Sequence, residues 1–161
     1  GKEERGATMN NKGEQRARVA KEFHWEMGHR LPFHTGGCQN IHGHSYRLWV
    51  EVEGALDPNG MLVDYFDLKQ IIEPMIATID HAFLCDDKDA LMLDFLAQTP
   101  LKHVVVPFNT TAENLAVWLL DRIAGGLAHI PTITQLKVRL HETERTYAER
   151  TRSIGISELH P

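Results

Sequence analysis

The chain has 161 residues and a formal net charge of −5, because 22 Asp and Glu outnumber 17 Lys and Arg. This length fits one domain with a core large enough to fold without cross-links, and a second full domain is not expected. The acidic balance argues against a nucleic-acid-binding module, and no apolar run approaches the roughly 20 residues of a membrane span. The polar start lacks the apolar core of a signal peptide, so we expect a soluble, cytoplasmic protein.

Histidine is the unusual residue type in this chain. There are ten histidines, and five of them fall within 21 consecutive residues: His24, His29, His34, His42 and His44. The two cysteines, Cys38 and Cys85, are too few for a disulfide framework. We therefore expect the functional site in the histidine-rich stretch.

The first third of the chain predicts a polar tail and two strands. Residues 1–15 carry almost no large apolar side chain, so we expect a mobile tail there and a single domain over 16–161. The stretch 16–28 has the β-branched and aromatic residues of a strand, and 31–40, with a proline and two glycines, predicts a loop. In 42–54 apolar and polar residues alternate cleanly, which predicts a half-buried strand.

The middle of the chain predicts a turn, a short strand and a helix. Residues 57–60 are typical of a turn and 61–63 of a strand, and Asp64 can cap a helix whose apolar residues recur every three or four positions. Pro74 lies inside that apolar stripe, so we expect a kink or a break there. Residues 82–109 give no readable pattern, and their structure is left open.

The last third predicts a second helix and two strands. The helix begins at Thr110, which forms a capping box with Glu113, and it ends at a pair of glycines. Alternation over 132–142 predicts a strand with Glu142 on its apolar face, and 145–149 predicts a returning strand. The order of elements indicates an α+β fold, with helices packed on one face of an antiparallel sheet.

The second predicted strand carries two histidines on its apolar face. Residues two apart on a strand project the same way, so His42 and His44 can share one metal ion. Zinc often has three protein ligands when one position stays open for substrate, and imidazoles suit zinc better than a hard, oxygen-seeking cation. His29 is the predicted third ligand, and His24 and His34 are its competitors.

Several other residues could take part in chemistry. Cys38 lies four residues before His42, where it could be a fourth zinc ligand, an inert loop thiol or a base activated by a nearby cation. Asp80 and His81 could pair only across a turn, since neighbours on a strand point to opposite faces; otherwise Asp80 is a cap and His81 is exposed. Cys85 is interpreted as a small buried hydrophobe. Three further histidines are interpreted as surface residues: His103, His129 and His160.

Glu142 would be costly to bury without a partner. A planar ligand that offers two adjacent N–H groups would satisfy both carboxylate oxygens at once, as a guanidinium does. The alternative is an ion pair with Arg139 or Arg145, and the sequence favours neither interpretation.

Six motifs occur in the order typical of the 6-pyruvoyltetrahydropterin synthase superfamily. The chain resembles this superfamily over about residues 18–150, and in particular its bacterial branch of 6-carboxytetrahydropterin synthases in queuosine (7-deazaguanine) biosynthesis. The motifs are H-R-L at 29–31, C-Q-N-I-H-G-H at 38–44, V-D-Y-F-D-L-K at 63–69, I-D-H at 79–81, T-A-E-N at 111–114 and H-E-T at 141–143.

The resemblance implies a tunnelling fold (T-fold). In this fold each subunit gives a four-stranded antiparallel sheet and two helices, and the sheets join into a barrel in a homo-oligomer with active sites between subunits. The resemblance also implies lyase activity on 7,8-dihydroneopterin triphosphate, which is converted to 6-carboxy-5,6,7,8-tetrahydropterin with loss of acetaldehyde and triphosphate.

The resemblance further implies a role for each site residue. Cys38 matches the general base, and Asp80 and His81 match the relay pair that works with it. Glu142 matches the acid that anchors the pterin ring, and Thr111 matches a pterin contact. The zinc ligands that it implies are His29, His42 and His44.

Two features bear on the branch. Three residues separate Cys38 from His42, as in the carboxy branch, whereas the pyruvoyl branch has a longer interval. Cys38 also speaks against a related group that uses a nearby Glu in folate synthesis. The alternatives are a 6-pyruvoyltetrahydropterin synthase, a zinc-dependent hydrolase and a non-catalytic zinc- or pterin-binding protein. The stretch 86–108 is longer than in compact members, and Cys85 stands where Asn is common.

Overall fold

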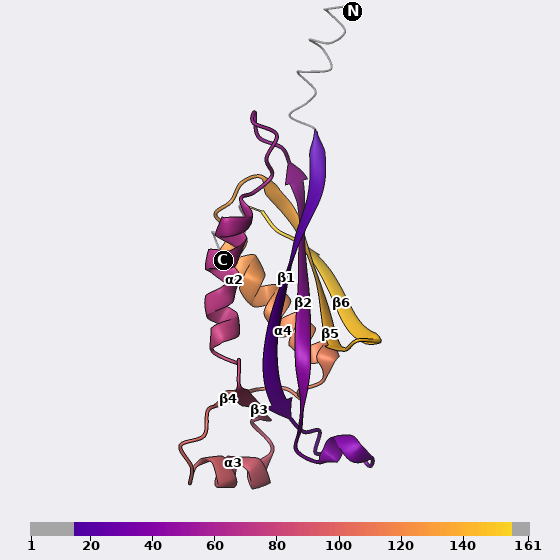
Figure 1. The fold of residues 1–161 in the computed structure, drawn as a ribbon, viewed down its shortest axis with the longest axis vertical. Helices are drawn as coiled ribbons and strands as arrows, with labels where there is room; N and C mark the ends of the chain where they lie inside the picture. Colours follow the sequence, from indigo (N-terminus) through magenta and orange to yellow (C-terminus); the bar gives the residue numbers. More distant parts are fainter. Residues whose placement is uncertain (1–14, 156–161) are drawn as a thin grey trace, which may run out of the picture.

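A computed structural model describes residues 15–155 of the chain. Two helices lie against one face of a long, twisted sheet, and a third, short helix lies at one end of the molecule (Figure 1). Most of the expected tail, residues 1–14, and His160 lie outside the described residues. No helix in the described part is long and apolar enough to cross a membrane.

The sheet has six strands in the order β4-β3-β1-β2-β5-β6. The elements are β1 (Arg16–His29), a 3-10 turn (Gly37–Gln39), β2 (His42–Ala55), α2 (Tyr65–Ala77), β3 (Ala82–Asp86), α3 (Ala90–Leu96), β4 (His103–Val106), α4 (Ala112–Leu127), β5 (Ile133–Thr143) and β6 (Thr146–Ser153).

The predicted α+β class is confirmed, but the expected four-stranded antiparallel sheet with two helices is wrong. Strands β1, β2, β5 and β6 do form an antiparallel sheet, whereas β3 pairs in parallel with both β1 and β4. The two added strands and α3 come from the stretch that gave no readable pattern. Elements of four to seven residues are too short to show a periodicity.

The core lies between the sheet and helices α2 and α4. Strands β1 and β2 pair with Phe23 opposite Leu48 and Met27 opposite His44, so their buried residues share one face. Helix α2 buries Leu68, Ile72 and Ile76 against it, and α4 adds a longer apolar stripe. Towards the end of β1 and the start of β2, histidines take the place of apolar residues on this same face.

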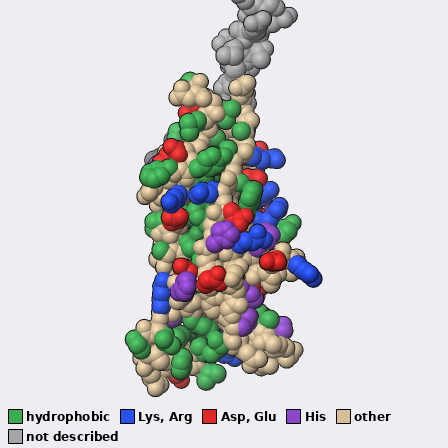
Figure 2. All heavy atoms as spheres, in the orientation of Figure 1, with side chains coloured by type: hydrophobic (Ala, Val, Ile, Leu, Met, Phe, Trp, Pro, Cys, Tyr) green, Lys and Arg blue, Asp and Glu red, His purple; other side chains and the backbone are tan. Residues whose placement is uncertain are grey.

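The end of the molecule that carries β3, α3 and β4 has a small core of its own, formed by Cys85, Met92 and Leu96. Cys85 is buried, as predicted, and burial raises the pKa of its thiol to about 11. Hydrophobic side chains also gather on the surface here, over α3 (Figure 2), and they include Leu91 and Phe95. This end therefore has a minor hydrophobic core that is separate from the main core.

Helix α2 runs unbroken from Tyr65 to Ala77 with Pro74 inside it, so the predicted break is wrong. A proline leaves the carbonyl four residues earlier without its helical partner, and here both Pro74 and Gln70 are exposed, where water can bind that carbonyl. Residues 61–63 form no strand; Met61 instead accepts a hydrogen bond from the Asp57 N–H and closes the preceding turn.

Helix α4 differs from its prediction at both ends. Its cap is Thr111 rather than Thr110, and the Thr111 side chain accepts from the Asn114 N–H, so the predicted pairing with Glu113 is wrong. The helix also continues through the glycine pair to Leu127. Gly126 is needed for packing, because a Cβ there would lie 2.7 Å from Ile71 of α2.

Candidate metal centre and active site

Three histidines meet where β1 ends and β2 begins. His29 lies directly opposite His42 in the strand pairing, and His44 follows two residues later on the same face. One ring nitrogen of each lies within 4.8 Å of the other two, so the three could hold a metal ion. The ring centroids are 4.6 Å apart for His29 and His42, and 5.0 Å apart for His42 and His44.

Backbone carbonyls orient two of these rings. Nδ1 of His29 lies 2.8 Å from the Thr110 carbonyl oxygen, and Nδ1 of His42 lies 2.8 Å from the Asn40 carbonyl oxygen. A carbonyl only accepts, so both Nδ1 atoms carry a proton, and the Nε2 of each ring is the nitrogen left for a metal. Such partners are what fix metal-binding imidazoles in proteins.

Burial completes the metal-binding character of the trio. His29 is 1% exposed, and the Nε2 atoms of His29 and His44 are buried with no hydrogen-bond partner among the described residues. The pKa of His29 is lowered to about 4, mainly by burial and also by the neighbouring His42 and His44, while the hydrogen bond to Thr110 opposes this shift. Burial also lowers the pKa of His44. Both rings are therefore neutral near pH 7, the form that binds metals.

Glu142 points into the same site from β5. Its Oε1 lies 3.4 Å from Nε2 of His29 and 3.7 Å from Nε2 of His44, and it accepts from the Tyr46 hydroxyl at 3.4 Å. Burial, with the Glu142 charge, raises the pKa of Tyr46. Because the His29 Nε2 carries a lone pair, two acceptors face each other here, and a cation between them would relieve the repulsion. The residues therefore fit a metal ion.

The competing residues lie elsewhere. His24 is exposed and pairs with Glu22 at 2.9 Å, and the His34 ring accepts from the Gly36 N–H at 2.8 Å. Arg139, one possible partner of Glu142, pairs instead with Glu149 at 2.9 Å. The predicted surface residues His103 and His129 are indeed exposed.

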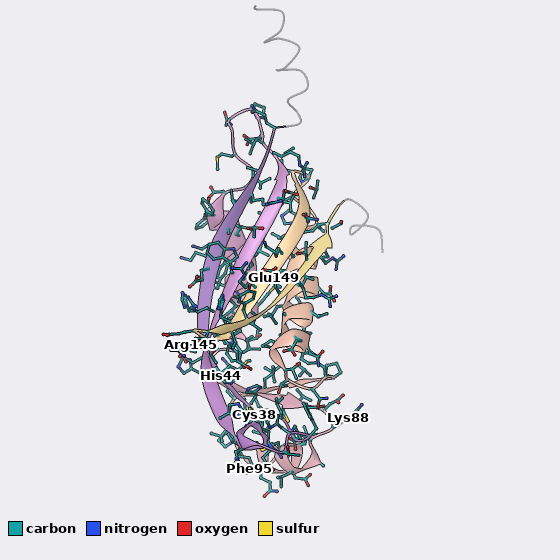
Figure 3. All side chains as sticks on the ribbon, turned by 90° about the vertical axis from the view of Figure 1, so that its right-hand side faces the viewer. Cys38, His44, Lys88, Phe95, Arg145 and Glu149 are labelled. Atoms are coloured by element: carbon teal, nitrogen blue, oxygen red, sulfur yellow. The ribbon has the colours of Figure 1, made fainter. Side chains whose placement is uncertain are left out.

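Cys38 lies in the 3-10 turn between β1 and β2. It is partly buried, and it is not among the residues whose ligand atoms meet at the histidine trio. Figure 3 shows Cys38 and His44 at the same end of the sheet. The turn is held by two hydrogen bonds, from the Leu31 N–H to the Cys38 carbonyl oxygen and from Arg30 Nε to the Gln39 carbonyl oxygen, each 2.8 Å long.

Asp80 and His81 pair directly, because a turn separates α2 from β3. His81 has a φ of 58°, in the left-handed region, and its Nδ1 lies 2.8 Å from Asp80 Oδ1. The turn is bound to β1: the Glu26 N–H donates to Asp80 Oδ1 at 3.0 Å, and the His81 N–H donates to the Glu26 carbonyl oxygen at 2.6 Å. The Glu26 N–H is the main cause that lowers the pKa of Asp80.

His44 and His81 border one hollow of about 380 Å³. Gly28 and Gly43 lie opposite each other in the strand pairing and form part of its lining, where no side chain fills the space. A small molecule in this hollow could therefore contact both His44 of the trio and His81 of the Asp80–His81 pair.

The sequence did not indicate Thr110 as a residue of the site, and the geometry leaves open the role of Thr111 as a pterin contact. Thr110 is buried, and its carbonyl and hydroxyl oxygens lie 2.8 and 3.2 Å from His29 Nδ1. Thr111 caps α4, so its hydroxyl oxygen is already an acceptor, with its own O–H free to donate. Nothing but the position of Thr110 before a helix start could have pointed to it.

The family of 6-pyruvoyl tetrahydropterin synthases matches residues 18–153 of the chain. The chain belongs to this family. Its relatives carry the names of pterin synthases, and the chain is an enzyme of the same family.

Two relatives represent two activities within the family. The 6-carboxy-5,6,7,8-tetrahydropterin synthase of Haemophilus influenzae is 36% identical over 140 residues, which are 82% of this chain and 96% of that protein. The 6-pyruvoyl tetrahydrobiopterin synthase of Poecilia reticulata is 38% identical over 114 residues, 68% of this chain and 66% of that protein. Several other relatives are also named 6-carboxy-5,6,7,8-tetrahydropterin synthases, and for some of them the name is preceded by the word putative.

The fold agrees with that of solved family members. The structure of the Plasmodium vivax 6-pyruvoyl tetrahydropterin synthase superposes with a TM-score of 0.71 at 16% identity, and covers 88% of this chain and 100% of that one. At this identity the likeness concerns the fold alone.

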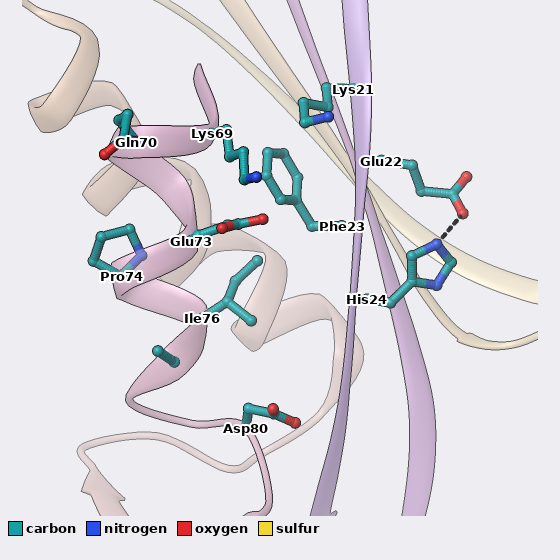
Figure 4. A pocket seen from close by; sticks show the side chains of 11 residues that line it. Lys21, Glu22, Phe23, His24, Lys69, Gln70, Glu73, Pro74, Ile76 and Asp80 are labelled. Atoms are coloured by element: carbon teal, nitrogen blue, oxygen red, sulfur yellow. Dashed lines mark ion pairs between the residues drawn. The ribbon is translucent and has the colours of Figure 1, made fainter. Parts of the chain in front are cut away.

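A larger hollow of about 590 Å³ lies between β1 and α2 (Figure 4). Lys69 and Glu73 of the helix face Phe23 of the strand across it, and Asp80 lies at its lower end. Strand β1 has a paired neighbour on this side only at Met27 and Gly28, where β3 begins. The hollow thus follows a sheet edge and does not include the histidine trio.

Proposed function

We propose that the protein is a zinc-dependent 6-carboxytetrahydropterin synthase of queuosine biosynthesis. It would convert 7,8-dihydroneopterin triphosphate and one water to 6-carboxy-5,6,7,8-tetrahydropterin and release acetaldehyde and triphosphate, with the water supplying the second carboxyl oxygen. The observation that carries the proposal is the meeting of His29, His42 and His44 at one point, with the Nε2 atoms of His29 and His44 buried and unpartnered among the described residues, in a chain that shares 36% identity with a bacterial enzyme of that name.

The trio would hold zinc through one ring nitrogen of each histidine, which in His29 and His42 is the Nε2 that the hydrogen bond of Nδ1 leaves available. His29, His42 and His44 supply three ligands, which leaves a coordination position for substrate. Zinc bound there would act as a Lewis acid on hydroxyl oxygens of the substrate side chain. Thr110 and Asn40 keep the rings of His29 and His42 turned towards the ion.

Cys38 and His81 would move the protons. Cys38 would take a proton at one substrate carbon and His81 would return one at another, after which the carbon–carbon bond breaks in a retro-aldol sense. Asp80 binds Nδ1 of His81, so the Nε2 of that ring is left for the substrate. The His81 side chain is 76% exposed, which suits a group that meets an incoming ligand.

Glu142 would anchor the pterin ring. Its carboxylate is 24% exposed, and its two oxygens can accept from two adjacent N–H groups of an aminopyrimidine. Placed beside the trio, it would set the substrate side chain over the metal site. Thr111 would add a donor through its free O–H.

A homo-oligomer would complete the barrel and the active site. The edge of β1 over residues 16–25 has no paired strand among the described residues, and β6 forms the other long edge of the sheet. An open sheet edge is a ready template for another strand. Pairing of these edges between subunits would close the sheets into a ring, with the 590 Å³ hollow beside β1, which Asp80 helps to line, at the junction.

One assay tests the proposal directly. The zinc-loaded protein is incubated with 7,8-dihydroneopterin triphosphate, and the products are identified by mass. We expect 6-carboxy-5,6,7,8-tetrahydropterin and acetaldehyde. A 6-pyruvoyl product would make the protein the alternative synthase, and pterin binding with no turnover would make it a binding protein. Light scattering of the same sample would show whether the protein is an oligomer, and a monomer would contradict the barrel.

A further inference from the structure

The segment Asp86–Lys102, which we call the bridging segment, lies outside the histidine trio. It leaves β3, forms α3 and returns to the start of β4. No residue of it belongs to the trio or to the relay pair. The Lys102 side chain nevertheless contacts the turn that carries His81, and the Asp89 side chain reaches the turn that carries Cys38 through Arg30.

The first contact runs from Asp89 to the turn of Cys38. Asp89 has a side chain only 4% exposed, and both its oxygens accept from Arg30 Nη1 at 2.9 Å. The same guanidinium donates through Nε to the Gln39 carbonyl oxygen, one residue after Cys38. A buried carboxylate paired in this way fixes the guanidinium, and the guanidinium in turn fixes the Cys38 turn.

The second contact runs from Lys102 to the turn of His81. Lys102 Nζ donates to the carbonyl oxygens of Ala77 and Asp80, at 2.8 and 2.6 Å. The last carbonyls of a helix lack helical partners and carry partial negative charge, so an ammonium group there is favourable. The Lys102 carbonyl oxygen also accepts from the Phe83 N–H at 3.0 Å, which holds the lysine beside the turn.

The conformation of His81 makes this second contact significant. A non-glycine residue at a φ of 58° costs free energy and persists only when its surroundings hold it there. Glu26 holds the turn from one side, through its own N–H and carbonyl. Lys102 holds it from the other side, at the carbonyl that immediately precedes His81.

We propose that the bridging segment is a positioning element for the proton relay. Asp89 fixes the Cys38 turn through Arg30, and Lys102 fixes the turn that presents His81. The proposal rests on the proposed function, since it assigns the relay to Cys38 and His81. Neither Asp89 nor Lys102 touches the trio, so both act through the residues that they hold.

The test compares three variants of the zinc-loaded full chain. In Lys102→Met we expect kcat to fall by about 10-fold or more, the usual cost of removing a group that orients a site residue, with KM and zinc content unchanged. Lys102→Arg keeps a cation with several donors and should recover most of kcat. Lys88→Met is the matched control, because Lys88 is an exposed lysine of the same segment at its outer side (Figure 3).

A second measurement needs no turnover. The His81 amide is protected by the Glu26 carbonyl, so its hydrogen exchange should be at least several-fold faster in Lys102→Met than in the wild type or in Lys88→Met. For the first contact, Arg30→Lys keeps the charge but loses the bond to Gln39, and alkylation of Cys38 by iodoacetamide should accelerate, with the buried Cys85 as internal reference.

The outcomes separate this inference from the proposed function. If the wild type turns over and Lys102→Met has the same kcat, or Lys102→Arg gives no recovery, the positioning role is wrong. If the wild type gives no turnover, the proposed function fails, and the exchange and alkylation rates still decide whether the segment holds the two turns. Unchanged rates in both variants would overturn the inference on their own.

Discussion

The histidine trio and the Asp80–His81 pair are built in two different ways. In the trio, the pairing of β1 with β2 sets the positions of the rings, and burial keeps His29 and His44 neutral. In the pair, one exposed ring stands on a turn with a left-handed residue, which hydrogen bonds from Glu26 on one side and Lys102 on the other hold in place. The sheet therefore fixes the proposed metal ligands, whereas the proposed relay pair depends on contacts between loops.

This difference has a mechanistic meaning. A metal site gains affinity when its ligands need no rearrangement, and a pair of strands supplies that rigidity. A group that takes and returns a proton has to reach the substrate, which suits an exposed side chain on a turn. The predictions below test each half of this contrast.

Removal of one metal ligand should have the largest effect. His42→Ala takes away one of three imidazoles that face a single point, so we expect stoichiometric zinc and measurable turnover to be lost together. Metal analysis after dialysis measures the first, and the product assay measures the second. His24→Ala, at an exposed histidine of the same stretch, is the control and should keep both. Full zinc content in His42→Ala would refute the ligand assignment.

Removal of the proposed base should leave the metal site intact. Without a general base, kcat should fall by about 10²–10⁴-fold in Cys38→Ala. Zinc content and pterin binding should stay at wild-type levels, since the thiol is not part of the trio. Cys85→Ala is the matched control at the buried cysteine and should keep kcat. Full activity in Cys38→Ala would remove this residue from the mechanism.

The sequence predicts the trio well because strand periodicity determines it. Alternation over 42–54 places His42 and His44 on one face, and the end of the preceding strand brings His29 opposite them. The same alternation indicates Glu142, whose carboxylate does reach the trio. Wherever a long strand has one buried face, position along the chain translates directly into position in the site.

The relay pair and its supports could not be derived in this way. The pairing of Asp80 with His81 depends on a positive φ, and the bonds from Glu26 and Lys102 join residues far apart in the sequence. Strand β6 extends to Ser153, beyond the predicted 145–149, because it is an edge strand with almost no buried face and hence no alternation. Periodicity reports burial and is silent where burial is absent.

Neutralising the proposed pterin anchor should separate substrate binding from metal binding. In Glu142→Gln the carboxylate becomes an amide that can no longer accept two charge-assisted bonds, so pterin affinity should fall by about 10- to 100-fold. Zinc should remain, because the three imidazoles are untouched. Glu144→Gln, at an exposed glutamate of the neighbouring turn, is the control. Unchanged pterin affinity in Glu142→Gln, measured by fluorescence titration, would exclude the anchoring role.

The smallest predicted effect is on the stability of the metal-free protein, and it comes from the buried His29 of the trio. The pKa of His29 is about 4 in the folded chain and about 6.5 when unfolded, so on acidification the unfolded chain binds its proton first. The stability that a neutral His29 contributes is thus fully present above pH 6.5 and is lost as the pH falls towards 4. Between pH 6 and 5 this loss amounts to about 1.2 kcal/mol.

The measurement is urea unfolding of chelator-treated protein at pH 7, 6 and 5, for the wild type and His29→Gln. Carboxylates that titrate in this range affect both proteins alike, so the difference between the two stability curves isolates His29. The wild-type curve should fall more steeply than that of the variant. His24→Gln, which alters an exposed ring, should follow the wild type. Parallel curves for the wild type and His29→Gln would mean that burial does not hold this ring neutral. The buried His29 would then not differ in this respect from the exposed His81.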